Sequence, residues 1–333
     1  MQDAENSLMK TGMWRVLWYF RSVIYHSTFL ESRLAGEPFS TLLNICLMRS
    51  FIAKICTALI FLLTGITSLN AQPDVVATIR PLQLIAMAVT DGVSEPVSLF
   101  DQTQDPHHPS LRPSQRRTLD NADILLWVGT ELETGLEKVI GEIDARVIAA
   151  LDINGVTIQV SGNRTDPHVW LDTRNTAAIA VELANVLSEI DGGNSGRYTS
   201  NLDEFLKGLD VLENRIGELV SHGDGHAYAI YHNGYQYFEK QFGLEHAASF
   251  TNNEEVSPGI RHILSVKSIL EENDVNCILA GPSVNTRQLA NQLDLKDIQF
   301  VDIDILAINA GAGKEAYFRF LEDVAVAFNT CLN

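Results

Sequence analysis

Short apolar runs alternate with amphipathic segments along the chain after residue 71. In the first series, runs rich in branched apolar residues are followed by segments with apolar positions at helical spacing. The expected strands are 75–79, 97–100 and 124–128. The expected helices are 81–89, a helix opened by Leu111-Arg112-Pro113-Ser114, and a helix with Leu132, Leu136, Val139 and Ile140 on one face. Repeated strand–helix units predict a mostly parallel sheet with helices on both faces.

The pattern changes after Asp172, where two long helical segments follow one another. The first covers 173–190 and ends at Asp191-Gly192-Gly193-Asn194, and the second covers 195–220 without a proline. Apolar residues keep helical spacing along the second segment. At 1.5 Å per residue it would form a rod of about 39 Å. Its position suggests a stiff connection between two domains, although an ordinary long core helix would show the same spacing.

A second strand–helix series follows the long helix. Its expected strands are 227–231, 247–250, 277–280 and 299–303, and its expected helices are 235–242, 258–272 and 314–328. We therefore predict an α/β protein: two βα-repeat lobes with mostly parallel sheets, joined by a long rigid backbone helix, with a cleft between the lobes. The predicted boundaries are 72–194 for the N-terminal lobe, 195–222 for the linking helix and 223–333 for the C-terminal lobe.

The first 71 residues follow a different pattern. Residues 48–54 are a short basic start, 55–63 are apolar, and the stretch ends in small and polar residues at Ala71. This layout predicts a secretory signal peptide over 48–71, cleaved after Ala71, and hence a periplasmic protein. A transmembrane anchor is the alternative, but a bilayer span needs about twenty apolar residues. We interpret residues 1–47 as a non-native N-terminal extension, with Met48 as the true initiator.

Charge and cysteine content fit an exported protein. The whole chain has a formal net charge of −18, and residues 72–333 hold 18 basic and 38 acidic side chains. An acidic surface repels nucleic acid and concentrates cations, although solubility is the simpler reason for most of these charges. Cys277 and Cys331 are the two cysteines after residue 71. An isolated pair in an exported protein favours a disulfide, and two buried free thiols are the alternative.

Three histidines and one aspartate lie where strands end or helices begin. His107 follows the strand that ends at residue 100, His168 precedes the helix at 173, and His232 and Asp304 each follow a predicted strand. In open α/β sheets, ligands bind outside the carboxyl ends of the strands. Three imidazoles and a carboxylate suit Zn²⁺ and are acceptable to Mn²⁺ or Fe²⁺. We therefore predict a metal site in the cleft.

Several segments resemble the zinc-binding proteins of bacterial ABC importers. The resemblance extends from about residue 73 to the C-terminus. The segments that carry it are Asp105-Pro106-His107-His108-Pro109-Ser110-Leu111-Arg112-Pro113-Ser114, Asn121-Ala122-Asp123, Trp127-Val128-Gly129, Pro167-His168-Val169-Trp170-Leu171 and Tyr231-His232-Asn233-Gly234-Tyr235-Gln236-Tyr237-Phe238-Glu239-Lys240-Gln241-Phe242-Gly243-Leu244. The last of these is the most specific.

The resemblance implies a cluster A-I solute-binding protein that holds one metal ion between its lobes. His107, His168 and His232 match the three histidine ligands of the family. Asp304 matches the aspartate that manganese-binding relatives use as a fourth ligand, whereas zinc members leave that place to water or a carboxylate. Such a protein would capture Zn²⁺ in the periplasm and deliver it to an ABC permease in the inner membrane. We expect it to act as a monomer.

The chain departs from the family pattern in three places. Residues 153–165 are short and hold no histidine, whereas many zinc members carry a long His-rich and acidic loop there. Gly281-Pro282 stands where a common relative has a glutamate before the proline. His108 replaces an acidic neighbour of the first ligand.

Two other functions compete with zinc delivery. A secreted zinc hydrolase also uses three protein ligands and an open position, but the chain has no His-Glu-x-x-His motif and no obvious general base beside a ligand. We therefore expect no enzymatic activity. A manganese- or iron-binding member of the same family, or a metal-binding adhesin, is the nearer alternative. In each metal-binding case, affinity should fall as the histidines are protonated.

Overall fold

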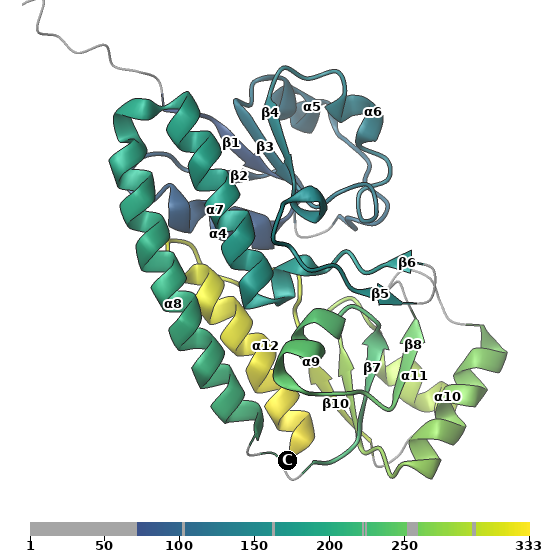
Figure 1. Ribbon diagram of the computed structural model, residues 1–333. Helices are drawn as coiled ribbons and strands as arrows, with labels where there is room; N and C mark the ends of the chain where they lie inside the picture. Colours follow the sequence, from purple (N-terminus) through teal and green to yellow (C-terminus); the bar gives the residue numbers. More distant parts are fainter. Residues whose placement is uncertain are drawn as a thin grey trace, which may run out of the picture. The chain divides into compact units, whose positions relative to one another are not determined.

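The computed structural model describes residues 72–333, apart from 102–103, 162–163, 222, 224, 252–258 and 295–297 (Figure 1). The predicted signal peptide and the upstream extension lie outside the described residues. Within the described part, no helix is both long and apolar enough to cross a membrane.

The first sheet has four parallel strands in the order β2-β1-β3-β4. They are β1 (Val75–Ala77), β2 (Val97–Ser98), β3 (Ile124–Trp127) and β4 (Arg146–Ala149). Every residue of β1 and β3 is buried, as expected of central parallel strands covered on both faces. Helices α4 (Arg80–Val89), α5 (Pro113–Asp120) and α6 (Glu137–Ile140) follow β1, β2 and β3.

The second sheet is also parallel, in the order β10-β9-β7-β8. Its strands are β7 (Tyr228–His232), β8 (Ala248–Thr251), β9 (Cys277–Ala280) and β10 (Gln299–Asp302). Its helices are α9 (Gln236–Phe242), α10 (Ile260–Glu272), α11 (Thr286–Leu293) and α12 (Ala316–Leu332). A short antiparallel hairpin, β5 (Val160–Ser161) with β6 (Arg164–Thr165), separates the two series.

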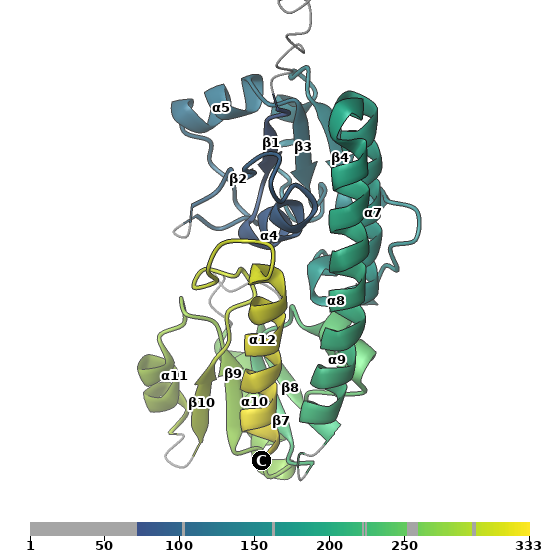
Figure 2. The ribbon, with the colours of Figure 1, turned by 90° about the vertical axis from the view of Figure 1, so that its left-hand side faces the viewer.

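Two long helices lie side by side, and the longer of them runs beside both sheets (Figures 1 and 2). They are α7 (Thr173–Ile190) and α8 (Ser195–Ser221). The apolar face of α8 packs on α7, α4 and α12, so one helix contacts elements of both lobes. A Cβ atom at Gly208 would lie 2.3 Å from the ring of Phe318, so this glycine allows the close approach of α8 to the start of α12. The predicted fold class, two parallel α/β lobes with a long backbone helix, is confirmed.

The segment after β3 differs from the prediction. A helix was expected through residues 132–140, but only α6 (Glu137–Ile140) is helical, and the residues before it form turns. Glu133 explains the difference, because its fully buried carboxylate accepts hydrogen bonds from the N–H groups of Val128 (3.0 Å) and Gly129 (3.1 Å). These contacts fold the segment back onto the end of β3. The sequence prediction also missed β4, α11 and the β5–β6 hairpin.

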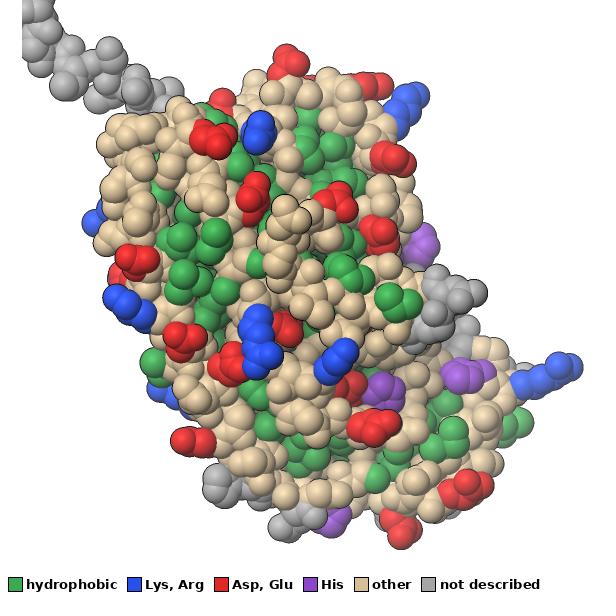
Figure 3. All heavy atoms as spheres, viewed as in Figure 1, with side chains coloured by type: hydrophobic (Ala, Val, Ile, Leu, Met, Phe, Trp, Pro, Cys, Tyr) green, Lys and Arg blue, Asp and Glu red, His purple; other side chains and the backbone are tan. Residues whose placement is uncertain are grey.

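A disulfide joins Cys277 of β9 to Cys331 of α12, as predicted. It fastens the closing helix to an interior strand across a sequence separation of 54 residues. On the face shown in Figure 3, acidic and basic side chains are scattered among hydrophobic and neutral ones and do not form a single charged patch.

Candidate metal centre

Three histidines from separate segments converge between the two sheets. His107 lies in the loop between β2 and α5, His168 immediately precedes the short 3-10 helix η2 (Val169–Leu171), and His232 is the last residue of β7. Each offers a ring nitrogen within 4.8 Å of the others. In the described residues, no other group of three or more His, Cys, Asp or Glu side chains meets this criterion.

The spacing between the rings suits ligands of one small cation. Nε2 of His168 lies 3.1 Å from Nε2 of His232, and their ring centroids are 4.9 Å apart. The ring of His107 completes the triangle, at 5.7 Å from His168 and 5.8 Å from His232. Two nitrogens bound to one tetrahedral Zn²⁺ at the usual bond length are about 3.3 Å apart. The pair His168–His232 is therefore close to the separation required for zinc, and the nitrogen that His107 offers lies within 4.8 Å of both.

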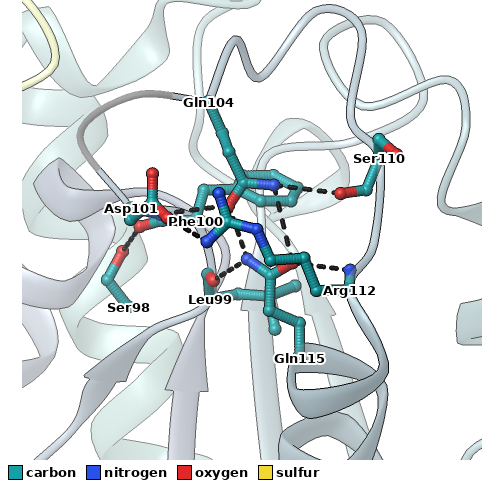
Figure 4. A network of polar contacts seen from close by, with 8 residues as sticks. All are labelled: Ser98, Leu99, Phe100, Asp101, Gln104, Ser110, Arg112 and Gln115. Atoms are coloured by element: carbon teal, nitrogen blue, oxygen red, sulfur yellow. Dashed lines mark hydrogen bonds and ion pairs between the residues drawn. The ribbon is translucent and has the colours of Figure 1, made fainter.

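A buried glutamine organises the loop that carries His107 (Figure 4). The Gln115 amide nitrogen donates to the carbonyl of Leu99 and to Oε1 of Gln104, at 2.6 Å each. Its Oε1 atom accepts from the N–H of Arg112 at 2.8 Å. Gln104 in turn donates to the carbonyl of Ser110 at 2.9 Å. One side chain on α5 thus ties the end of β2 to both sides of the loop, and it fixes where the loop places His107.

A carboxylate orients His168. Oδ1 of Asp166 lies 2.6 Å from Nδ1 of His168 and accepts a hydrogen bond from its backbone N–H at 3.0 Å. Both side chains are almost completely buried. An ionised carboxylate only accepts, so Nδ1 carries the proton and Nε2 keeps its lone pair for a cation.

His232 is held by the strand and by a close backbone turn. The next residue, Asn233, donates its N–H to the carbonyl of Thr251 on β8 at 2.8 Å, which continues the strand pairing past His232. A Cβ atom at Gly234 would lie 2.7 Å from Nε2 of His232 and 3.0 Å from Cε1 of His168. The missing side chain at Gly234 therefore leaves room directly beside the ring atoms that face the other histidines.

Burial keeps two of the rings neutral. Burial, followed by the electrostatic effect of the neighbouring His168, lowers the pKa of His107 to about 4. The pKa of His232 is lowered well below its usual value by burial and then by the other two histidines. Neutral imidazole is the form that binds a metal. The centre is therefore poised to hold one cation instead of several protons.

Asp304, the fourth predicted ligand, lies outside the group of three histidines. Its carboxylate accepts hydrogen bonds from the N–H groups of Leu306 (3.1 Å) and Asn309 (3.0 Å), and burial raises its pKa. The loop that follows Asp304 is nevertheless linked to the centre, because Trp170 Nε1 donates to the carbonyl of Ile305 at 2.8 Å. His108 also lies outside the group, with an exposed ring beside Asp105.

Sequence reasoning missed Asp166 and Gln115 as supports of the site. Asp166 stands two residues before His168, in the stretch that drew attention to the site, so its proximity was visible in the sequence. Gln115 reaches a carbonyl 16 residues away. No local pattern reports such a contact.

Comparisons with known proteins agree with this geometry. A family model described as "Zinc-uptake complex component A periplasmic" matches residues 75–331. The high-affinity zinc uptake system protein ZnuA of Haemophilus ducreyi is 27% identical over 305 residues, covering 83% of this chain and 98% of that protein. The protein of the same name from Yersinia pestis is also 27% identical, covering 79% and 92%.

Solved structures share the fold. A crystal structure of ZnuA matches with a TM-score of 0.69 at 19% identity, covering 79% of this chain and 100% of that one. The laminin-binding protein Lmb of Streptococcus agalactiae, described as bifunctional with adhesin and metal-transporting activity, matches with a TM-score of 0.70 at 18% identity, covering 79% and 100%. At these identities, the likeness concerns the architecture of the two lobes.

Proposed function

Because this chain belongs to the family of the periplasmic component A of zinc-uptake complexes, we propose that it captures one Zn²⁺ in the periplasm and delivers it to an ABC-type permease. The protein carries out no reaction on the ion. Its work is to bind the cation tightly at low concentration, to present the bound form to the permease, and to release the ion there.

One observation carries this proposal, namely the convergence of His107, His168 and His232 within 4.8 Å. We propose these three side chains as ligands, with Nε2 of His168 presented by Asp166. Three imidazole nitrogen ligands favour Zn²⁺ over Mn²⁺ both by ligand type and by the general affinity order of divalent metals. We propose water or Asp304 for the fourth position, the latter after a change in the turn that now engages its carboxylate.

The position of the three ligands supports a delivery mechanism. His107 and His168 belong to the segments of the first lobe, and His232 ends a strand of the second sheet. An ion bound to all three would join the two lobes. A membrane permease that contacts both lobes could then distinguish the loaded protein from the empty one, and a single copy of the chain would suffice.

Export would precede this function. We propose that residues 48–71 are removed as a signal peptide, leaving lobes at 72–194 and 223–333 joined by the helix at 195–222. Amino-terminal sequencing of the secreted protein tests this proposal. A first residue near Gln72 supports cleavage after Ala71, and recovery of a peptide from residues 1–47 would contradict the start at Met48.

The ligand assignment is tested by zinc titration of the metal-free protein in competition with a chelator. We expect one Zn²⁺ per chain, with the tight site lost in the triple variant His107→Ala, His168→Ala, His232→Ala. His262→Ala is the matched control, because that exposed ring on α10 contacts the carbonyl of Ser249, outside the group of three. Unchanged zinc affinity in the triple variant would show that the ion binds elsewhere.

Metal identity is tested separately. With Zn²⁺ and Mn²⁺ supplied together, and the bound metal measured after removal of free ions, we expect zinc to be retained. Retention of manganese in preference to zinc would overturn the proposed cargo and leave the three-histidine site intact.

A further inference from the structure

A cavity adjoins the loop that carries His107, and none of the three histidines of the metal centre lines it. Its volume is about 570 Å³, which falls in the range of pockets that hold small organic molecules. Its lining residues come from the start of α4, from β2 and the loop after it, and from the loop after β10. They are Ile79, Arg80, Gln83, Ser98, Phe100, Asp101, Gln104, Pro106, Leu306 and Ile308.

The cavity lies close in sequence to His107 and to Asp304. Pro106 immediately precedes His107, and Leu306 is two residues after Asp304. Leu306 and Ile308 come from the second lobe, whereas the rest of the lining comes from the first. A molecule in the cavity would therefore contact both lobes.

Arg80 is the lining residue that points to a ligand class. Its guanidinium donates to Oε1 of Gln83 (2.6 Å) and to the carbonyls of Gly311 (2.7 Å) and Ala310 (3.3 Å). All three acceptors are neutral, and among the described residues no carboxylate pairs with Arg80. A guanidinium has five N–H donors, and these three hydrogen bonds use one on Nη1 and both on Nη2, which leaves Nε–H and one Nη1–H for a ligand. A half-buried cation with neutral partners favours a negatively charged ligand in the adjoining space.

The rest of the wall limits the kind of anion. The other charged lining residue, Asp101, is paired with Arg112, which offsets its negative charge (Figure 4). Half of the lining is apolar, including the ring of Phe100 and the side chains of Leu306 and Ile308. The Nε–H and one Nη1–H remain free on different edges of the guanidinium, so one carboxylate would take a single charge-assisted hydrogen bond, whereas the apolar wall suits a carbon body.

We propose that this cavity binds a small organic monocarboxylate, with its carboxylate on Arg80 and its apolar body against Phe100 and Ile308. The site is independent of the metal, because no predicted metal ligand lines it. Its occupant would rest on the first lobe and on the loop that follows Asp304.

The probe is phenylacetate, titrated calorimetrically into the metal-free full chain that carries the triple histidine substitution. We expect saturable binding of one phenylacetate per chain, and binding at least about tenfold weaker in Arg80→Gln, since a charge-assisted hydrogen bond contributes more than the free energy of one decade in affinity. Arg146→Gln is the control, because Arg146 is an exposed arginine on β4 that lies outside the cavity lining. It should bind phenylacetate as the parent does.

Two further comparisons keep the test decisive if Arg80→Gln unfolds. Ile308→Trp fills the cavity from the other lobe and leaves Arg80 in place, and it should also abolish binding. Uncharged phenylacetamide should bind at least about tenfold more weakly than phenylacetate. Absence of phenylacetate binding, equal binding of phenylacetamide, equal binding of inorganic phosphate, or full binding by Ile308→Trp would each overturn the proposal. Zinc titration of the unsubstituted chain is a separate measurement, so failure of either assignment is seen independently.

Discussion

Replacing Glu133 by glutamine should stabilise the protein, and the gain should depend on pH. Burial raises the pKa of the Glu133 carboxyl from its ordinary 4.5 to about 7, against the opposing effect of the N–H groups of Gly129 and Val128. The side chain is fully buried, and no cationic partner contributes to the shift. The folded protein therefore binds this proton more tightly than the unfolded chain does.

The size of the effect follows from the pKa difference. Below the unfolded pKa of 4.5, both states hold the proton and the carboxyl has no ionisation cost. Between pH 4.5 and about 7 the unfolded chain releases the proton and the folded chain retains it, so stability falls with rising pH. Above about 7 the cost levels off at about 3 kcal/mol, because each pKa unit corresponds to about 1.4 kcal/mol. Glutamine does not ionise, and its carbonyl oxygen still accepts the two backbone N–H groups.

The assay is urea unfolding of the metal-free protein at about pH 5 and about pH 8, followed by far-UV circular dichroism. We expect Glu133→Gln to be close to the parent in free energy of unfolding at the lower pH and about 3 kcal/mol more stable at the higher one. Glu131→Gln is the matched control, because Glu131 is exposed two residues away. A difference between Glu133→Gln and the parent that does not change with pH, or that Glu131→Gln reproduces, would refute the argument from burial.

Three further predictions concern the centre and the disulfide. Asp166→Asn should lower zinc affinity by about 10- to 100-fold, because the Asp166 carboxylate holds the proton on Nδ1 of His168 and leaves Nε2 to bind the ion. Unchanged affinity in the competition titration would contradict that role of Asp166. Three ordinary imidazoles would make zinc affinity fall roughly thousandfold between pH 7.5 and 5.5. Because burial holds the pKa of His107 at about 4, we expect the affinity to fall by much less than that. A thousandfold fall would refute the burial effect. Removing the disulfide with Cys277→Ala and Cys331→Ala should lower the free energy of unfolding by about 4 kcal/mol, as the chain-entropy model gives for a 54-residue loop. Urea unfolding measures this difference. Equal stability with and without the bond would contradict the prediction.

The broad architecture could be predicted because local patterns report it. The apolar runs that became β1 and β3 are continuous, as buried parallel strands require, and α8 keeps helical spacing over its length. The histidine positions followed from the same patterns, because a strand end or a helix start places its flanking residues at one edge of a sheet. For His232 the boundary shifted by one residue, since it ends β7 instead of following it.

What the sequence did not reveal depends on contacts between distant groups. Whether residues 132–136 are helical is decided by the buried Glu133 carboxylate and the N–H groups at the end of β3, and these contacts compete with the helical periodicity of the segment. Asp304 was predicted to join the histidines, yet the backbone N–H groups of its own loop engage its carboxylate. Residue type and spacing identify such groups as ligand candidates. Which acceptor meets which donor is set by the turn that the backbone adopts.

The Cys277–Cys331 bond also makes part of the chain a covalent ring. The ring contains α11, β10, the loop from Asp304 that lines the cavity beside Arg80, and nearly all of α12. A single peptide-bond cut anywhere inside it leaves the two pieces attached through sulfur. A protein nicked at the exposed residues 311–313 of this loop would therefore migrate as one species without reductant and as two with it. In an oxidising compartment, one proteolytic cut would then not release the closing helix from the lobe.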